Sequence, residues 1–140
     1  MRVVLDEGAV LPQRAHGTDA GLDLFSREEK LIYPGSGTVF DTGVHVELPA
    51  GTYGKIESRS GLNMNEDVVS CGGVIDEGYT GSIRVKLYNL SNRYGRPYKV
   101  EKGQKIAQLV IMPCLRPELE ECEALSETER GDKGFGSTGL

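Results

Sequence analysis

The chain has 140 residues, a net charge of −5 and an isoelectric point near 5.1. This length fits a single domain, which is expected to bury about two thirds of its unfolded surface. The acidic balance argues against nucleic acid or anionic membranes as partners, although a few local cations could still hold a small anionic ligand. No apolar run approaches the ~20 residues that span a bilayer, and the first residues do not resemble a signal peptide.

The three cysteines, Cys71, Cys114 and Cys122, form no C-x-x-C pair. An odd number of thiols without an export signal predicts a reduced, intracellular setting. The two histidines, His16 and His45, have no companions at metal-ligand spacing, which argues against a zinc site.

Alternation of apolar and polar residues predicts strands along most of the chain. Residues 3–8 (VVLDEG) indicate a strand, and residues 31–40 (LIYPGSGTVF) indicate two strands joined by a turn. Every second side chain is apolar in residues 44–48 (VHVEL) and in residues 82–90 (SIRVKLYNL), which is typical of strands with one buried face. Residues 105–112 (KIAQLVIM) are more continuously apolar, as in a strand covered on both faces.

Glycine supplies the turns between these segments. The 19 glycines are about twice the usual share and are dispersed rather than periodic. Many short strands with regular turns predict an all-β sandwich or barrel. One short helix is expected after residues 58–61 (SRSG), with Ser60 as its cap and residues 62–66 (LNMNE) as its body. Residues 116–130 are rich in glutamate and are expected to be solvated.

Five short stretches carry residues suited to chemistry. They are DAGLDL (19–24), ESRSGL (57–62), GGVIDEGYTG (72–81), GQKIAQL (103–109) and RGDKGFGSTGL (130–140).

Asp76, in the third stretch, follows an apolar pair and precedes a turn. It either caps that turn through its own backbone or takes a proton from water in a partly desolvated pocket. Tyr79 is either a half-buried strand residue or a ring that packs on a sugar. The glycines at 72 and 73 would let a ligand approach the backbone closely.

Three further residues have two interpretations each. Arg59, at the predicted helix start, would suit a phosphate, although the same residues could form an ordinary capped turn. Gln108, inside an apolar strand, needs hydrogen-bond partners, which a neighbouring loop or a ligand could provide. Asp23 could form a structural ion pair with Arg59, bias a metal–phosphate complex, or do both.

These five stretches, in this order and spacing, resemble the five motifs of the trimeric dUTPase family, and together they span nearly the whole chain. Ser58 stands where the family more often has Pro, Gly78 where it commonly has an acidic residue, and Lys133 where it usually has Gly. The resemblance implies a distorted jelly-roll-like β-barrel with one short helix. It also implies a homotrimer in which the C-terminal arm is exchanged between subunits, with residues 1–115 as the barrel core and residues 116–140 as the extension and arm.

The resemblance implies hydrolysis of dUTP to dUMP and pyrophosphate, which limits uracil incorporation into DNA and supplies dUMP. Asp76 would activate the water that attacks the α-phosphorus. A Mg²⁺ cofactor would be held mainly by the substrate phosphates and reached by Asp23 through water. An intracellular location follows, in the cytoplasm of a cell or in a virus-infected host.

The remaining implied contacts are all to substrate. Phosphate oxygens would be held by Arg59, Ser60, Gly61 and Gln108. A tight hairpin from about Ser70 to Asp76, including Gly73, Val74 and Ile75, would read uracil through its backbone; Tyr79 would pack on deoxyribose, and Arg84 would lie near the base. From the arm, Phe135 would stack on uracil, and Arg130, Gly136, Ser137 and Thr138 would complete the grip on the substrate.

In this family each site is built from three chains. The first, second and fourth motifs come from one chain, the third from another and the fifth from the last. Two alternatives remain: a dCTP deaminase or bifunctional deaminase–diphosphatase of the same fold, and a nucleotide-sensing regulatory module.

Overall fold

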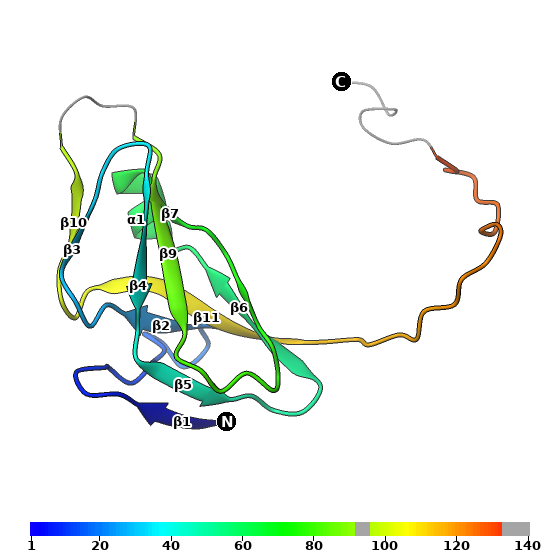
Figure 1. Cartoon of the computed structure of the whole chain (residues 1–140), viewed down its shortest axis with the longest axis horizontal. Helices are drawn as coiled ribbons and strands as arrows, with labels where there is room; N and C mark the ends of the chain where they lie inside the picture. The colour runs from blue at the N-terminus through cyan, green and yellow to red at the C-terminus, as the bar shows by residue number, and fades with distance from the viewer. Residues whose placement is uncertain (92–95, 133–140) are drawn as a thin grey trace.

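The fold is antiparallel β-structure with one short helix. In a computed structural model of the chain, residues 1–91 and 96–132 are described, and within them lie eleven strands and one helix (Figure 1). Their bounds are β1 Arg2–Leu5, β2 Gly21–Phe25, β3 Lys30–Ile32, β4 Gly37–Asp41, β5 Val44–Glu47, β6 Thr52–Glu57, α1 Ser60–Glu66, β7 Val68–Ser70, β8 Val74–Ile75, β9 Arg84–Asn89, β10 Tyr98–Val100 and β11 Lys105–Pro113.

Four antiparallel sheets share one core. A four-stranded sheet has the order β2-β11-β6-β8, a three-stranded sheet has the order β4-β9-β7, and two ribbons pair β1 with β5 and β10 with β3. Neighbouring strands in these sheets are far apart in sequence, as expected for a jelly-roll-like barrel rather than for consecutive hairpins. The predicted all-β class is confirmed.

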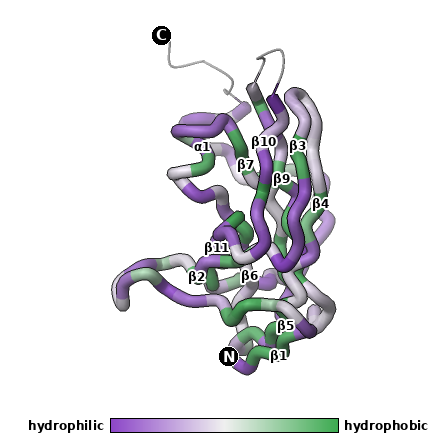
Figure 2. Tube along the Cα trace, turned by 90° about the vertical axis from the view of Figure 1, so that its left-hand side faces the viewer, coloured by the Kyte–Doolittle hydropathy of each residue, from purple (hydrophilic) through white to green (hydrophobic). Residues whose placement is uncertain are grey.

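Alternate side chains of β9 are buried in the core between the two larger sheets. In β9, Val85 and Leu87 are buried, whereas Arg84 and Lys86 on the other face are exposed. Figure 2 shows the matching alternation of hydrophobic and hydrophilic stretches along the strands. Asn89 continues the buried row, and its side-chain amide donates to the carbonyl oxygen of Ile32 at 3.1 Å. That bond satisfies a polar group that would otherwise be costly to bury.

Two local predictions are wrong. The residue that caps α1 is Arg59, in an extended conformation and without a side-chain capping bond, and Ser60 is already the first helical residue. The segment from Ser70 to Asp76 is not a hairpin, because β7 pairs with β9 and β8 pairs with β6. The chain instead crosses from one sheet to the other there, and Gly72 takes a positive φ of 22° at the crossing.

After β11 the chain leaves the barrel. Residues 114–132 contain no strand or helix and run away from the sheets (Figure 1). The expectation that the glutamate-rich segment is solvated is confirmed, since residues 115–132 are all exposed. The exposed side chains include three leucines, Leu115, Leu119 and Leu125. In the part of the chain that is described, no helix is long and apolar enough to cross a membrane.

Candidate functional site

A cavity of about 310 Å³ collects residues from three of the five predicted stretches. Its lining residues are Ala15, Asp19, Ala20, Gly21, Asp23, Arg59, Ser60 and Gln108. A larger cavity of about 410 Å³, between Asp67 and Tyr98, holds none of the predicted residues. The smaller cavity is therefore the candidate active site, because charged and polar groups from three of the predicted stretches converge there.

Strand register explains this convergence. Gln108 lies in β11, the strand that separates β2 from β6, and it pairs with Asp23 on one side and with Glu57 on the other. Beyond Glu57 the chain leaves β6 and places Arg59 and Ser60 at the start of α1. Three stretches distant in sequence thus meet at one end of the four-stranded sheet.

Asp23 organises the charge of the cavity. Its side chain is only 12% exposed, and its two carboxylate oxygens accept from different cations: Oδ1 from Nε of Arg59 at 3.1 Å, and Oδ2 from Nζ of Lys105 at 2.7 Å. The predicted Asp23–Arg59 ion pair is confirmed. The two cations neutralise the Asp23 carboxylate, and the Arg59 guanidinium, which lines the cavity, suits an anionic ligand.

Lys105 is a contributor that the sequence reasoning missed. It is the first residue of the apolar run 105–112, and in the sequence it indicates only where a strand begins. The β11–β2 register shifts between Lys105 and Ala107, and the Nζ of Lys105 lies within reach of Asp23. Asp19, which also lines the cavity, belongs to the first stretch but was not assigned a role. The backbone N–H of His16 lowers the pKa of Asp19, with smaller help from the His16 ring, and burial opposes both.

The structural hydrogen bond expected for Gln108 is present, and the ligand contact stays a prediction. Its Nε2 donates to the carbonyl oxygen of Ser58 at 3.1 Å, and the same side chain lines the cavity. Ser58 in turn accepts from the backbone N–H of Ser70 at 2.8 Å through its Oγ. The half-buried Ser70 is therefore tied to the end of β6, next to the cavity.

The third stretch lies outside this cavity. Asp76 is exposed just after β8, and its carbonyl oxygen accepts from the backbone N–H of Tyr79 at 3.0 Å, which closes a turn. Tyr79 is 43% exposed and its hydroxyl donates to the carbonyl oxygen of Ser82 at 3.0 Å. Neither Asp76 nor Tyr79 lines the cavity of its own chain.

The other residues predicted for base recognition surround this turn. Val74 is 63% exposed and Gly73 is exposed, whereas Ile75 is buried in the core. Arg84 is exposed at the start of β9, opposite Asp41. Within one chain, these residues and the cavity form two separate groups.

Glu77, beside Asp76, fixes the base of the C-terminal extension. Its Oε2 accepts from Arg116 at 2.5 Å and from the backbone N–H of Gly51 at 3.0 Å. The Arg116 hydrogen bond is the main reason that the pKa of Glu77 is lowered, and the Gly51 N–H adds to it. The turn that carries Asp76 and the start of the extension are therefore attached to each other.

Of the predicted tail residues, only Arg130 lies in the described part of the chain, where it is exposed. Phe135, Gly136, Ser137 and Thr138 lie outside the described residues. Gly61 is the second residue of α1, adjoining Ser60 at the cavity. Within the described ranges, no three His, Cys, Asp or Glu side chains gather in a way that could hold a metal ion.

Sequence comparison decides the family. The family model for dUTPase matches residues 7–139, nearly the whole chain. The chain belongs to the dUTPase family. Deoxyuridine 5'-triphosphate nucleotidohydrolases from Clostridium acetobutylicum and Clostridium tetani are each 47% identical to it, over 97% of this chain and 93% of theirs.

Solved dUTPase structures agree with the fold. The Staphylococcus bacteriophage 80alpha dUTPase with dUPNHPP superposes with a TM-score of 0.89 at 35% identity, covering 99% of this chain and 98% of that one. A mutant dUTPase from phage phi11 of S. aureus, described as coordinating a structural Mg(II) ion, superposes with a TM-score of 0.80 at 35% identity. It covers 88% of this chain and 96% of that one. The distorted jelly-roll-like barrel of the dUTPase family is thus the fold of this chain.

Proposed function

We propose that the protein hydrolyses dUTP to dUMP and pyrophosphate. The observation that carries this proposal is the convergence of Asp23, Arg59, Ser60 and Gln108 on one cavity, in a chain of the dUTPase family. The Arg59 guanidinium there suits a triphosphate, and the named substrate of the clostridial relatives is a deoxyuridine triphosphate.

In the proposed mechanism, Asp76 orients a water molecule and takes its proton as that water attacks the α-phosphorus in line with the departing pyrophosphate. The exposed position of Asp76 at the end of β8 supports this role, because its carboxylate is accessible to a second molecule. Positioning and charge stabilisation supply most of the rate enhancement in such reactions.

The phosphates are proposed to lie in the cavity. Arg59 and Ser60 donate to their oxygens, Gly61 allows close approach of the α1 backbone, and the Gln108 amide faces the same space. Asp23 would contact a Mg²⁺ ion through water, and that ion, held mainly by the substrate phosphates, would neutralise part of their charge. The residues present fit such a contact through water rather than direct binding of the ion. Asp23 is already paired with two cations, and no carboxylate cluster adjoins it among the described residues.

The segment that crosses between the two sheets, together with the turn after it, is proposed to recognise the base and the sugar. The exposed backbone of Gly73 and Val74, next to Ser70 and the buried Ile75, would read uracil. Tyr79 would pack on deoxyribose and exclude a ribose 2′-hydroxyl.

Arg84 is proposed to lie near the base. It is exposed at the start of β9, the strand that follows the turn.

A homotrimer with shared sites is proposed because the proposed site residues of one chain do not lie together in that chain. Asp76 and Tyr79 lie outside the cavity that holds Arg59, so a site with all three requires more than one chain. Residues 1–115 form the barrel core, and residues 116–140 form an extension whose arm reaches a third chain. From that arm, Phe135 would cover uracil, and Arg130, Gly136, Ser137 and Thr138 would close over the phosphates.

The alternatives are not favoured by the family match, and each has its own test. A deaminase would release ammonia from dCTP. A regulatory module would capture a partner protein in a dUTP-dependent pull-down without turning dUTP over. A cytoplasmic location, in a cell or an infected host, is proposed from the nucleotide-metabolic role.

The direct test is pyrophosphate release from dUTP compared with dTTP, dCTP and UTP. The proposal expects rapid release from dUTP only. Comparable rates with dTTP or UTP would exclude the base and sugar recognition described above, and no release from dUTP would exclude the proposed reaction.

A further inference from the structure

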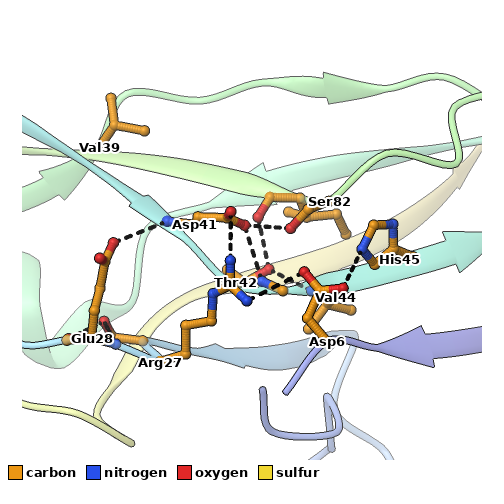
Figure 3. A network of polar contacts seen from close by, with 12 residues as sticks. Asp6, Arg27, Glu28, Val39, Asp41, Thr42, Val44, His45 and Ser82 are labelled. Atoms are coloured by element: carbon orange, nitrogen blue, oxygen red, sulfur yellow. Dashed lines mark hydrogen bonds and ion pairs between the residues drawn. The ribbon is translucent and has the colours of Figure 1, made fainter. Parts of the chain in front are cut away.

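His45 belongs to a ring of residues where β1, β4 and β5 meet the segment after Asp76, and Figure 3 shows most of its members. Polar contacts close the ring except between Thr80 and Ser82, which the backbone joins. The ring joins five places in the sequence through side chains that the proposed catalysis does not use. In order, its members are Arg27, Asp6, His45, the backbone of Thr80, Ser82 and Asp41.

His45 bridges two groups that can only accept hydrogen bonds. Its Nδ1 lies 2.8 Å from the carbonyl oxygen of Thr80, and its Nε2 lies 3.2 Å from Oδ1 of Asp6. A neutral imidazole carries one N–H and can donate to only one of them. The imidazolium donates to both, so this geometry selects the doubly protonated ring.

The charges around His45 favour the same form. Asp6 and Asp41 face it from the ends of β1 and β4, while Arg27 bridges both carboxylates at 3.3 Å and 2.8 Å. The Arg2–Glu47 ion pair lies on the neighbouring β1–β5 ribbon and contributes one charge of each sign. The hydrogen bond to Thr80 is the main reason that the pKa of His45 is raised above its ordinary value of 6.5; burial opposes it and Asp6 adds to it.

Ser82 gives the same segment a second anchor. Its Oγ donates to Oδ1 of Asp41, which also accepts from the backbone N–H of Gly43 at 3.1 Å. The hydroxyl of Thr42 donates to the carbonyl oxygen of Ile83 at 2.7 Å. The backbone from Thr80 to Ile83 is therefore held by side chains from β5, the end of β4 and the residue after it.

This anchored segment continues directly into the turn that carries the proposed catalytic residues. Thr80 follows Tyr79, whose backbone N–H closes the turn on Asp76 and whose hydroxyl donates to the carbonyl oxygen of Ser82. A displacement of Thr80 would therefore rotate Tyr79 and change the direction of Asp76.

We propose that His45 is a positioning residue for this turn: as an imidazolium it holds Thr80 against Asp6 and so fixes the direction of Asp76 and Tyr79. This inference rests on the proposed role of Asp76. Because the phosphates bind in a cavity made of other residues, loss of the His45 contact should lower kcat more than it changes KM.

Proton loss from His45 predicts a particular pH dependence. A pKa raised by partners in the folded protein means that the anchoring is complete at low pH and is lost as the pH rises through that pKa. We expect kcat of the wild-type protein to fall about three- to tenfold across that step, the range of one hydrogen bond, with KM changing less than about twofold.

Two variants and one control test this dependence in dUTP turnover measured from pH 6 to 9. His45→Gln removes the positive charge that joins Thr80 to Asp6 and does not titrate, so kcat should be low at every pH and the step should vanish. Asp6→Asn removes the stabilising carboxylate, so the step should move to lower pH. Glu47→Gln, on the same strand and with its own ion pair removed, should behave as the wild type. A step that persists in His45→Gln would overturn the proposal, as would wild-type kcat in that variant.

A spectroscopic measurement keeps the test independent of how the variants fold. The chain has two histidines, so ¹⁵N shifts of the His45 ring can be assigned and followed in the wild-type protein. Both ring nitrogens should be protonated below the kinetic step and one should lose its proton across it; a neutral ring throughout would overturn the proposal. An active Asp76→Asn variant would refute the role of Asp76, whereas an inactive one beside an unaffected His45→Gln would refute only the role of His45.

Discussion

Gln108 packs so closely against Gly21 that a β-carbon on Gly21 would lie 2.1 Å from its Oε1 and 2.9 Å from its Cδ. The two residues are neighbours across the β11–β2 pairing, at the wall of the proposed phosphate cavity. The absence of a side chain at position 21 is therefore what allows the amide of Gln108 to bond Ser58 and line the cavity.

Gly21→Ala is expected to displace the Gln108 amide and to lower kcat/KM for dUTP about tenfold to a hundredfold. That range corresponds to losing one hydrogen bond to a charged group. The fold should survive, because the clashing atoms are mostly the far end of a flexible side chain. Gly17→Ala is the matched control, since a β-carbon there meets nothing within 4 Å. Equal activity of the two variants in steady-state kinetics would show that Gln108 does not need its present position.

Asp76→Asn is expected to bind dUTP and to turn it over at least ~10²-fold more slowly, because an amide cannot take the proton from the attacking water. Binding is measured by calorimetry with a non-cleavable dUTP analogue, and turnover by pyrophosphate release. Near-normal turnover would remove Asp76 from the role of base.

Gly81→Ala is expected to weaken discrimination against ribose. A β-carbon at position 81 would lie 2.5 Å from the hydroxyl oxygen of Tyr79 and 2.6 Å from its Cζ, so the ring must move. The ratio of kcat/KM for dUTP over UTP should fall about tenfold or more, as expected when a close packing contact in a pocket is lost. Gly78→Ala, where an added β-carbon meets no atom within 4 Å, is the control for the turn. An unchanged ratio in Gly81→Ala would separate Tyr79 from sugar recognition.

Asp41 should contribute to stability at neutral pH and lose that contribution in acid. Burial acts to raise its pKa, but hydrogen bonds from Ser82 and Gly43 together with the charge of Arg27 outweigh it, so the pKa is lowered below its ordinary 3.8. A lowered pKa means that the stabilisation is present above about pH 4 and is lost as the pH falls through the folded-state value. The difference in free energy of unfolding between wild type and Asp41→Asn should therefore shrink from pH 7 to pH 3 in urea titrations at fixed protein concentration. A constant difference would contradict this prediction.

Mixing two inactive chains should restore activity if sites are shared. A chain deleted after Arg130 and a full-length Asp76→Asn chain are each expected to have poor activity, the first for lack of a tail and the second for lack of a base. A 1:1 mixture refolded together should recover part of the wild-type rate, because some mixed trimers contain a site with an intact copy of every part. Absence of recovery despite mixed trimers in native mass spectrometry would contradict site sharing.

The regular parts of this protein were accessible from sequence because local pattern decides them. Alternation in residues 82–90 predicted β9 and its buried Val85 and Leu87, and the Asp23–Arg59 pair followed from charge alone. Long-range register was not accessible in the same way. Nothing in the sequence places Lys105 on Asp23, and the pairing of β7 and β8 with different sheets replaced an expected hairpin. The ring around His45 was missed for the same reason, since its members come from five separated segments.

The three exposed leucines that follow β11 have a consequence for how the protein behaves on dilution. Leu115, Leu119 and Leu125 are exposed in a single chain, and apolar side chains of that size gain free energy when a surface covers them. In an arm-exchanged assembly a neighbouring chain supplies that surface, so the leucines stay covered only while the chains remain associated. Limited digestion should therefore cut residues 115–125 readily in nanomolar solutions and slowly in concentrated ones, which makes the arm a reporter of assembly.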